Sequence, residues 1–367
     1  MPNKQYTVGI VGLGYGRAHI AGFQAAGCQV LALCQRDTTA ATELAAHYGV
    51  PHVYADWREM ITTARPDILV IATPPVLHLP ILSAAVAAGA HVVCEKPLAL
   101  TVDEARAMIA AAQAAHRSAI VGFNWRFAPA MQRMKAMVDA GFLGRVFHVN
   151  CRWLNGAWVE RGTASSWRMN RAIAGYGALG DLGVHLIDLV RWLFGDIVRV
   201  LASSGVGYPS RTIPGGTRAA DAEDFSHVLA ELSSGATIAM TVSRVARGLN
   251  EHSLEVYGED GALSMRQSRV GHGWQLGQLS MAQGSDQLSP VELPSIAGSA
   301  GASDDRLDIT GVTTIAPMVR QFIAAIESPG RDAAPSLQDG LQAQAVLEAI
   351  TTSVERHAWI DVAPISD

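Results

Sequence analysis

The sequence predicts an α/β fold, in which an N-terminal domain with a parallel sheet precedes an α+β domain with a mainly antiparallel open sheet. Three observations lead to this prediction. Strand-like runs alternate with helix-like runs over the first third of the chain, hairpin-like runs replace that pattern after about residue 145, and 367 residues are too many for one ordinary core. We expect a first domain at residues 1–123 and a second at residues 124–367.

The first domain is expected to alternate strands with helices. Short apolar runs that alternate with helices ending in glycine are typical of βαβ units, which build a parallel sheet. The last helix opens on a capping-box pattern, with Glu104 three residues after Thr101. The predicted strands cover residues 6–14, 28–37, 67–75, 91–97 and 118–124, and the predicted helices cover residues 17–27, 39–49, 78–89 and 102–116.

The second domain is expected to contain strands joined by tight turns. The pairs Ser234-Gly235 and Asp260-Gly261 are hairpin signals between apolar runs. Few helices interrupt these strands, so the sheet should be mainly antiparallel. The predicted strands lie within residues 144–155, 226–247 and 252–267, and the predicted helices begin near Leu179 and cover residues 318–327 and 337–357.

Composition excludes several classes of partner. The net charge is −5 and no segment concentrates Lys and Arg, which disfavours nucleic acid and anionic membranes. The four cysteines form no Cys-x-x-Cys pair, which disfavours structural zinc and a disulfide framework. No signal peptide is recognisable, and the apolar stretches look too short or too interrupted to span a bilayer. We expect a cytoplasmic protein.

A glycine-rich loop follows the first predicted strand and opens the first helix. Its sequence is Gly12-Leu13-Gly14-Tyr15-Gly16-Arg17. Glycines let a backbone approach a pyrophosphate, and the helix N-terminus supplies N–H groups and partial positive charge. In this strand–loop–helix setting the loop predicts a dinucleotide site in a Rossmann domain. The third glycine is one residue early, and Arg17 in its usual place would put a cation near the phosphates.

The end of the second predicted strand bears on the choice of cofactor. An acidic side chain there binds the ribose hydroxyls of NAD, whereas an arginine accommodates the extra phosphate of NADP. Gln35 stands at the expected position and Arg36 follows it, which favours NADP over NAD. Two alternatives remain open: Asp37 could bind the ribose, and Arg36 could be a solvated loop residue.

The next two strands also end in polar or rigid residues. Thr73 and Pro74, with His78 just beyond, would flank the pyrophosphate and ribose; the alternative is a rigid turn in which His78 starts a helix. Glu95-Lys96-Pro97 ends the fourth strand, and ligands bind at the carboxyl edge of such sheets. Lys96 is therefore a candidate to act on a substrate oxygen, against the alternative of a surface Glu-Lys pair.

A second set of titratable residues lies on one predicted helix. If the chain is helical from Leu179, then Asp181, His185 and Asp188 share one face and apolar residues cover the rest. His185 is a candidate acid/base, and Asp181 could orient its ring or contact substrate. The alternatives are a core histidine bonded to Asp181 and a metal site. Together with Lys96 and the glycine loop, catalysis is favoured and no metal is predicted.

The chain resembles the Gfo/Idh/MocA oxidoreductase family (glucose-fructose oxidoreductase, inositol dehydrogenase and MocA). The resemblance rests on "IATPPVLH", "CEKPLALTVDEARAM", "GFNWRFAPAM", "DLGVHLIDLVRWLFG" and "LQDGLQAQAVLEAI", which occur in order along nearly the whole chain. It implies that Lys96, Asp181 and His185 are catalytic and that the Lys96-Pro97 bond is cis. It also implies that Trp167 and Arg168 lie near the cofactor, and that Asn124 and Arg126 lie in a loop near the nicotinamide. We further expect Glu95 and Lys96 to contact the cofactor. The candidates to contact substrate are Lys96, Arg126, Arg168, Asp181 and His185.

The expected function is hydride transfer between NADP, or NAD, and a hydroxyl or carbonyl group of a sugar, polyol or sugar acid. His185 would take the hydroxyl proton, and Lys96 would hold the developing alkoxide. Two alternatives are a non-enzymatic regulator that senses a dinucleotide or sugar, and a glycosidase that uses tightly held NAD. An open antiparallel sheet needs cover, so we also expect a homodimer or homotetramer.

Overall fold

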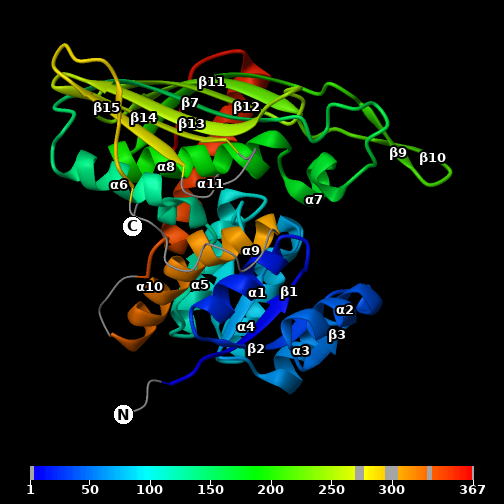
Figure 1. Cartoon of the computed structure of the whole chain (residues 1–367). Helices are drawn as coiled ribbons and strands as arrows, with labels where there is room; N and C mark the ends of the chain where they lie inside the picture. The colour runs from blue at the N-terminus through cyan, green and yellow to red at the C-terminus, as the bar shows by residue number, and fades with distance from the viewer. Residues whose placement is uncertain (1–3, 269–276, 294–304, 329–332, 366–367) are drawn as a thin grey trace. The chain divides into compact units, whose positions relative to one another are not determined.

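The computed structural model describes residues 4–268, 277–293, 305–328 and 333–365 (Figure 1). The described chain divides into two compact units. The first contains residues 4–127 and 305–341, and the second contains residues 128–293 and 342–365. Each unit has its own sheet, and each is described by itself below.

The sheet of the first unit is parallel throughout, which confirms the predicted fold class of this half. Its six strands run in the order β3-β2-β1-β4-β5-β6. Strand order reverses between β1 and β4, the position at which open α/β sheets bind ligands at their carboxyl edge. The strands are β1 (Thr7–Val11), β2 (Gln29–Cys34), β3 (His52–Tyr54), β4 (Ile68–Ile71), β5 (His91–Cys94) and β6 (Ala119–Val121).

Side chains cap the first turns of α2 and α5. Asp37 accepts from two N–H groups at the start of α2, and Thr101 accepts from Glu104 N at the start of α5, as the capping box predicts. Gly49 ends α2 in the left-handed conformation with φ 67°. The helices are α1 (Gly16–Ala25), α2 (Thr38–Tyr48), α3 (Trp57–Ala64), α4 (His78–Ala87), α5 (Val102–Ala114), α9 (Arg306–Thr310) and α10 (Ala316–Glu327), with short turns η1 (Pro75–Leu77), η2 (Asn124–Phe127) and η5 (Gly311–Ile315).

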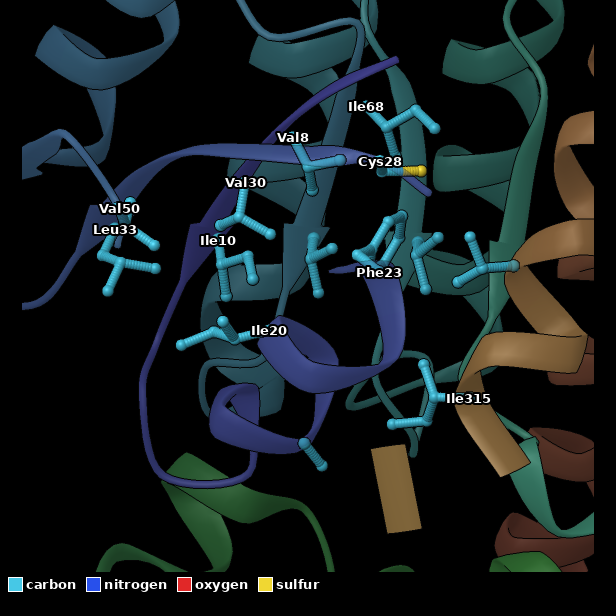
Figure 2. Close-up of a cluster of buried hydrophobic side chains, with 14 of the residues drawn as sticks. Val8, Ile10, Ile20, Phe23, Cys28, Val30, Leu33, Val50, Ile68 and Ile315 are labelled. Atoms are coloured by element: carbon cyan, nitrogen blue, oxygen red, sulfur yellow. The ribbon is translucent and has the colours of Figure 1, made fainter. Parts of the chain in front are cut away.

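Residues 305–328 and 333–341 pack into the first unit, although all of residues 124–367 were expected in the second domain. The reason is a close contact between α1 and η5. A Cβ added at Gly22 would lie 2.6 Å from Cγ2 of Ile315, and one added at Gly311 would lie 2.3 Å from the carbonyl oxygen of Ala18. Figure 2 shows Ile315 in the same apolar cluster as Val8, Ile10, Ile20, Phe23, Val30 and Leu33.

The second unit is built on a mixed, mainly antiparallel sheet, as predicted. Nine strands run in the order β16-β15-β14-β13-β7-β12-β11-β8-β17, and only the β7–β12 pair among these is parallel. The strands are β7 (Val146–Asn155), β8 (Ile197–Gly205), β11 (Phe225–Leu232), β12 (Thr237–Ser243), β13 (Asn250–Gly258), β14 (Gly261–Ser268), β15 (Gln278–Gln283), β16 (Ser289–Pro290) and β17 (Ile360–Asp361), with a separate hairpin of β9 (Ser210–Ile213) and β10 (Gly216–Ala219).

Helices α6 and α8 run along one face of this sheet (Figure 1). The helix predicted from Leu179 begins as a π-turn, η4 (Leu179–Gly183), and continues as α8 (Val184–Phe194). The long helix α11 (Leu337–Arg356) begins in the first unit and ends in the second. The other elements are α6 (Pro129–Asp139), η3 (Trp167–Met169) and α7 (Arg171–Ala174).

Two helical stretches of the described chain are long and apolar enough to span a membrane by composition, which differs from the expectation that none is. They are Arg171–Phe194 and Arg306–Glu327. In the first stretch, 83% of the most apolar 18-residue window is buried, and in the second stretch 56% of it is buried. The core helices of soluble proteins are buried in the same way. By themselves these stretches are weak evidence for a membrane.

Candidate functional site

The glycine loop has the geometry that a dinucleotide site needs. Gly12 has φ +88°, and a Cβ there would lie 2.5 Å from the carbonyl oxygen of Ala72, so the loop is pressed against the end of β4. A Cβ at Gly14 would meet nothing within 4 Å, so the outer side of the loop is open. Tyr15 is the N-cap residue of α1, and its side chain makes no hydrogen bond to the N–H groups of the first turn. The N–H groups of that turn can therefore serve an anion.

The early third glycine still has a packing function. A Cβ at Gly16 would lie 3.1 Å from Cγ2 of Ile10, so this glycine lets α1 approach β1 closely. Arg17, which the sequence analysis placed near the phosphates, has a carboxylate partner: its guanidinium lies 2.7 Å from Asp305, the N-cap of α9. Part of its charge is thus balanced by a residue 288 positions away.

The end of β2 contains the residues predicted to select the cofactor. Gln35 is half-buried, and Arg36 is exposed. Asp37 accepts hydrogen bonds from Thr39 N at 3.1 Å and from Ala40 N at 3.4 Å. Because one oxygen of Asp37 is engaged in capping α2, it is less available for a ribose than the sequence alone suggested.

His78, predicted to flank the cofactor, is fully buried. Its Nε2 lies 2.9 Å from the carbonyl oxygen of Thr73, and its Nδ1 lies 3.0 Å from that of Leu98. Burial lowers the pKa of His78. The ring therefore joins the loop after β4 to the loop after β5. This geometry favours the rigid-turn alternative, and a direct contact with cofactor stays a prediction.

Glu95 and Lys96 follow β5 at the same edge of the sheet. The N–H of Glu95 donates to Ile71 O at 2.8 Å, so the main chain is still paired with β4 there. The Glu95 carboxylate turns inward and lies 2.8 Å from Nε2 of His19 on α1. The Lys96–Pro97 bond is cis, as the resemblance implied. His19 was missed by the sequence analysis, because nothing in its local sequence distinguishes it from a core residue.

Asn124 and Arg126 lie in η2 and are buried. Nδ2 of Asn124 donates to Oγ1 of Thr314 at 2.7 Å and to the Tyr15 hydroxyl at 3.3 Å, which connects it to the glycine loop. Arg126 forms an ion pair with Asp339 at 2.9 Å. Its predicted contact with substrate is not tested by this geometry and stays a prediction.

Four buried side-chain atoms of the described first unit have no hydrogen-bond partner, among them Nε of Arg17 and Nδ1 of His19. The other two, Oγ1 of Thr73 and Oδ1 of Asn124, belong to residues that follow the carboxyl ends of β4 and β6. Buried polar atoms are nearly always hydrogen-bonded in folded proteins. With the open loop at Gly14, the Thr73 and Asn124 oxygens fit a bound dinucleotide that supplies polar groups along this edge.

In the second unit, the predicted helix face carries His185 and Asp188, 4% and 1% exposed. The π-turn η4 lies immediately before them, and such turns frequently occur at functional sites. The His185 ring stacks on Trp153 with centroids 5.4 Å apart, and Trp153 stacks in turn on His252 at 4.3 Å. The imidazole of His185 is thus oriented by an aromatic neighbour.

Asp181 has two arginine partners. Nε of Arg168 lies 3.5 Å from one carboxylate oxygen, and Arg244 contacts the other. Arg168 also lies over the ring of Trp167 at 4.3 Å, and Arg244 lies over a second indole. The sequence analysis missed Arg244, which follows β12 and belongs to no motif. Among the described residues, no group of three His, Cys, Asp or Glu side chains could hold a metal ion.

The predicted site residues therefore fall into two groups, one in each unit. The glycine loop, Thr73, Lys96 and Asn124 belong to the first unit. Trp167, Arg168, Asp181 and His185 belong to the second. The joint action of Lys96 and His185 on one substrate oxygen stays a prediction.

Known families match both halves of the chain. A model of the oxidoreductase family with an NAD-binding Rossmann fold matches residues 6–123, and a model of the GFO/IDH/MocA C-terminal domain matches residues 131–264. Levoglucosan dehydrogenase of Pseudarthrobacter phenanthrenivorans is 30% identical over 395 residues, which cover 99% of this chain and 100% of that protein. Inositol 2-dehydrogenase of Rhizobium meliloti is 27% identical, with 97% and 98% covered.

Solved structures show the same fold. A levoglucosan dehydrogenase in complex with NADH and L-sorbose has a TM-score of 0.87 at 28% identity and covers 99% of this chain and 100% of its own. An NAD binding oxidoreductase from Klebsiella pneumoniae has a TM-score of 0.85 at 28% identity, with the same coverage. These similarities extend over both units and confirm the predicted fold class.

Proposed function

The chain belongs to the GFO/IDH/MocA family of oxidoreductases, and we propose that it oxidises a hydroxyl group of a cyclic sugar with NAD as the hydride acceptor. It is an NAD(P)-dependent dehydrogenase that acts on a sugar hydroxyl or carbonyl group. The observation that supports NAD binding is the glycine loop, closed against β4 at Gly12 and open at Gly14. The ring sugar is proposed because the relatives named for levoglucosan, D-apiose and D-glucosides act on such sugars.

The chain's residues have separate roles in this proposal. A bound nicotinamide supplies the acceptor for the hydride that leaves the carbon bearing the hydroxyl group. The Lys96 ammonium donates a hydrogen bond to the hydroxyl oxygen and stabilises the negative charge that develops there. The His185 imidazole takes the hydroxyl proton. Asp181, held by Arg168 and Arg244, accepts a hydrogen bond from a neighbouring sugar hydroxyl.

The cofactor can be tested by titrating NADH and NADPH separately against the purified protein and following nucleotide fluorescence. We expect NADH to bind, and Gly14→Ala to weaken it by about tenfold or more without changing the melting temperature, because Gly14 faces open space. Gly12→Ala should instead lower the melting temperature, since its Cβ would clash with Ala72. Binding of neither nucleotide to cofactor-free protein would contradict the proposal.

The same titration tests the preference for NADP that Gln35 and Arg36 predict. Arg36 is exposed and could meet a 2′-phosphate, whereas the relative's complex contains NADH. If NADPH binds more tightly than NADH and Arg36→Ala weakens NADPH binding, Arg36 selects NADP as the cofactor. Tighter NADH binding, unchanged by Arg36→Ala, would make NAD the cofactor.

The substrate class can be tested with NAD reduction on levoglucosan, D-apiose, D-glucosides and inositol. We expect turnover of at least one ring sugar, and a loss of about a hundredfold or more in kcat/KM for Lys96→Ala and for His185→Ala. If the variant that combines Lys96→Ala and His185→Ala turned over sugar as fast as the native protein, neither residue would take part in the mechanism. Absence of turnover across a wide sugar panel would contradict the proposed activity.

Two further expectations belong to this proposal. We propose that the protein is cytoplasmic, which its composition supports, and that it forms a homodimer or homotetramer. The expectation of a homo-oligomer rests on the outer face of the nine-stranded sheet, where Asn150, Arg152 and Ala239 are exposed.

A further inference from the structure

A buried hydrogen bond links the helix after the glycine loop to the residue before the predicted catalytic lysine. His19 lies in α1 and is 0% exposed, and Glu95, directly after β5, is 5% exposed. Nε2 of His19 donates to Oε1 of Glu95 at 2.8 Å, since a carboxylate oxygen can only accept. Neither side chain is explained by the proposed chemistry, and both lie within one compact unit.

The carboxylate reaches Lys96 directly. Oε2 of Glu95 accepts from the N–H of Lys96 at 3.3 Å. Burial alone would raise the pKa of Glu95, but the hydrogen bond and charge of His19, together with the charge of Lys96, hold it below its usual value. The carboxylate is therefore fixed against the main chain of Lys96, and its charge interacts with that of the Lys96 side chain.

The surroundings leave this carboxylate little freedom. A Cβ added at Gly122, just after β6, would lie 2.6 Å from Oε1 of Glu95, so the main chain of that glycine closes one side. On the other side of Lys96, Nδ1 of His78 lies 3.0 Å from the carbonyl oxygen of Leu98. The segment that bears Lys96 thus lies between contacts of two buried histidines, His19 and His78.

A purely structural role is a poor explanation for the pair. A buried carboxylate costs free energy that well-packed apolar side chains would avoid, and the adjoining core is filled by Ile10, Ile20 and Phe23. A hydrogen-bonded carboxylate provides a fixed direction and a fixed negative charge, which an apolar contact does not.

We propose that His19 is a positioning residue for Lys96: through the Glu95 carboxylate it fixes the main chain from which the lysine side chain extends and the direction of a negative charge that acts on that side chain. The proposal rests on the proposed function in that Lys96 is the group that holds the substrate oxygen. It extends that function by giving the helix of the cofactor loop a second role, the placement of the catalytic lysine.

The kinetic test compares His19→Leu, which keeps volume but removes the donor, with His19→Gln, which keeps a donor for Glu95. The control is His91→Asn at the opposite end of β5, where the ring accepts from Ser118 N at 3.1 Å. We expect His19→Leu to lower kcat by about tenfold or more while the Kd for NADH changes less than twofold. His19→Gln should recover most of kcat, and His91→Asn should leave it unchanged.

A double-variant cycle separates positioning from general loss of structure. If His19 acts through Lys96, His19→Leu should cost little in a Lys96→Ala background, so the two effects are not additive. Fully additive losses, or a loss of kcat that only follows a lower melting temperature, would overturn the proposal. If His19→Leu does not fold, Glu95→Gln replaces it, because the amide keeps the shape and removes the charge.

A second measurement does not need turnover. The chain has three lysines, Lys4, Lys96 and Lys135, so trace acetylation with acetic anhydride can be read for each by mass spectrometry. Loss of the nearby charge favours the unprotonated, reactive amine. We therefore expect Lys96 to react about threefold faster or more in Glu95→Gln and His19→Leu, relative to Lys4 and Lys135, and at the native rate in His91→Asn.

The two readouts distinguish the two failures. If native protein oxidises no sugar but the reactivity of Lys96 responds to His19 and Glu95, the proposed function is wrong and the positioning stands. If sugar is oxidised and Lys96 reacts at one rate in all variants, the function stands and the positioning is overturned.

Discussion

At the scale of single residues, the candidate site depends on partners that lie far away in the sequence. Asp181 is contacted by Arg168, which lies in η3, and by Arg244, which follows β12. Two guanidinium groups fix both carboxylate oxygens in position, because each can donate several hydrogen bonds in one plane. The carboxylate is thus prepared to receive a sugar hydroxyl in one orientation.

This arrangement predicts a catalytic effect for a residue outside every recognised motif. Arg244→Ala should lower kcat/KM by about tenfold or more, because Asp181 loses one of its two anchors. The matched control is Arg247→Ala, whose ion pair with Glu160 joins side chains that are 67% and 68% exposed, and it should change kcat/KM less than twofold. Equal effects in steady-state kinetics would remove Arg244 from the site.

The sequence could predict the residues that carry chemistry better than those that support them. Lys96 and His185 could be recognised because each stands in a local pattern, a strand end or a buried helix face. His19 and Arg244 look like ordinary core and loop residues in their local sequence. Their contacts depend on which elements become neighbours, and no local pattern in a single sequence contains that information.

At the scale of elements, α11 is tied to η2 by a partly buried ion pair at its first turn. Asp339 accepts from Ser336 N at 2.7 Å, and Oγ of Ser336 accepts from Asp339 N at 3.1 Å, which makes a reciprocal cap. The same carboxylate forms the ion pair with Arg126. Burial alone would raise the pKa of Asp339, but Arg126 and the Ser336 hydrogen bonds hold it below its usual value.

The lowered pKa predicts how this contribution depends on pH. Unfolded Asp339 has a pKa of about 3.9, so its stabilisation is complete above that pH and is lost as pH falls through the lower folded pKa. Asp339→Asn should therefore lower the free energy of unfolding by about 1–3 kcal/mol at pH 7, and the difference should shrink below about pH 4. Denaturant unfolding at several pH values measures it.

The control for this prediction is Asp103→Asn, which removes a surface partner of Arg106 from a side chain that is 93% exposed. Its effect should be within about 0.5 kcal/mol at pH 7. A difference between native protein and Asp339→Asn that persists unchanged to pH 2 would show that the cap, and not the charge, stabilises α11.

Element prediction found most strands and most helices of the parallel sheet domain, and it missed elements of several lengths, including the eleven-residue helix α6 and the nine-residue strand β8. The three-residue strand β3 and the helix α3 were missed, because His52–Tyr54 is a partly exposed edge strand and Trp57–Ala64 buries only Met60 and Ile61. The π-turn before α8 was also missed. A single inserted residue in a helix leaves no sequence signal when both flanks are apolar.

At the scale of the whole molecule, the chain returns to its first unit after completing the sheet of the second. Segment 305–341 packs on α1 through Gly22 and Gly311, which allow backbone contact that a Cβ would block. The change in local texture near residue 145 predicted the start of the antiparallel sheet correctly. It could not predict this return, because α9 and α10 resemble helices of either domain.

The outer face of the nine-stranded sheet leads to a prediction about assembly. One row of neighbours crosses four strands, from Leu201 through Leu229 and Ala239 to Asn150. Leu229 is 50% exposed at the centre of this row, although helices cover the opposite face of the sheet. A flat sheet face with exposed apolar side chains is typically buried by a second layer, and a second copy of the chain can supply it symmetrically.

If such an assembly forms through this face, a charged side chain at its centre should break it. Leu229→Arg should shift the mass measured by light scattering from a dimer or tetramer to a monomer, because an unpaired guanidinium cannot be buried between two sheets. Val76→Arg in the first unit, where the native side chain is 42% exposed, is the matched control and should keep the native mass. A native protein that is monomeric, or a Leu229→Arg variant of unchanged mass, would mean that this face stays in solvent.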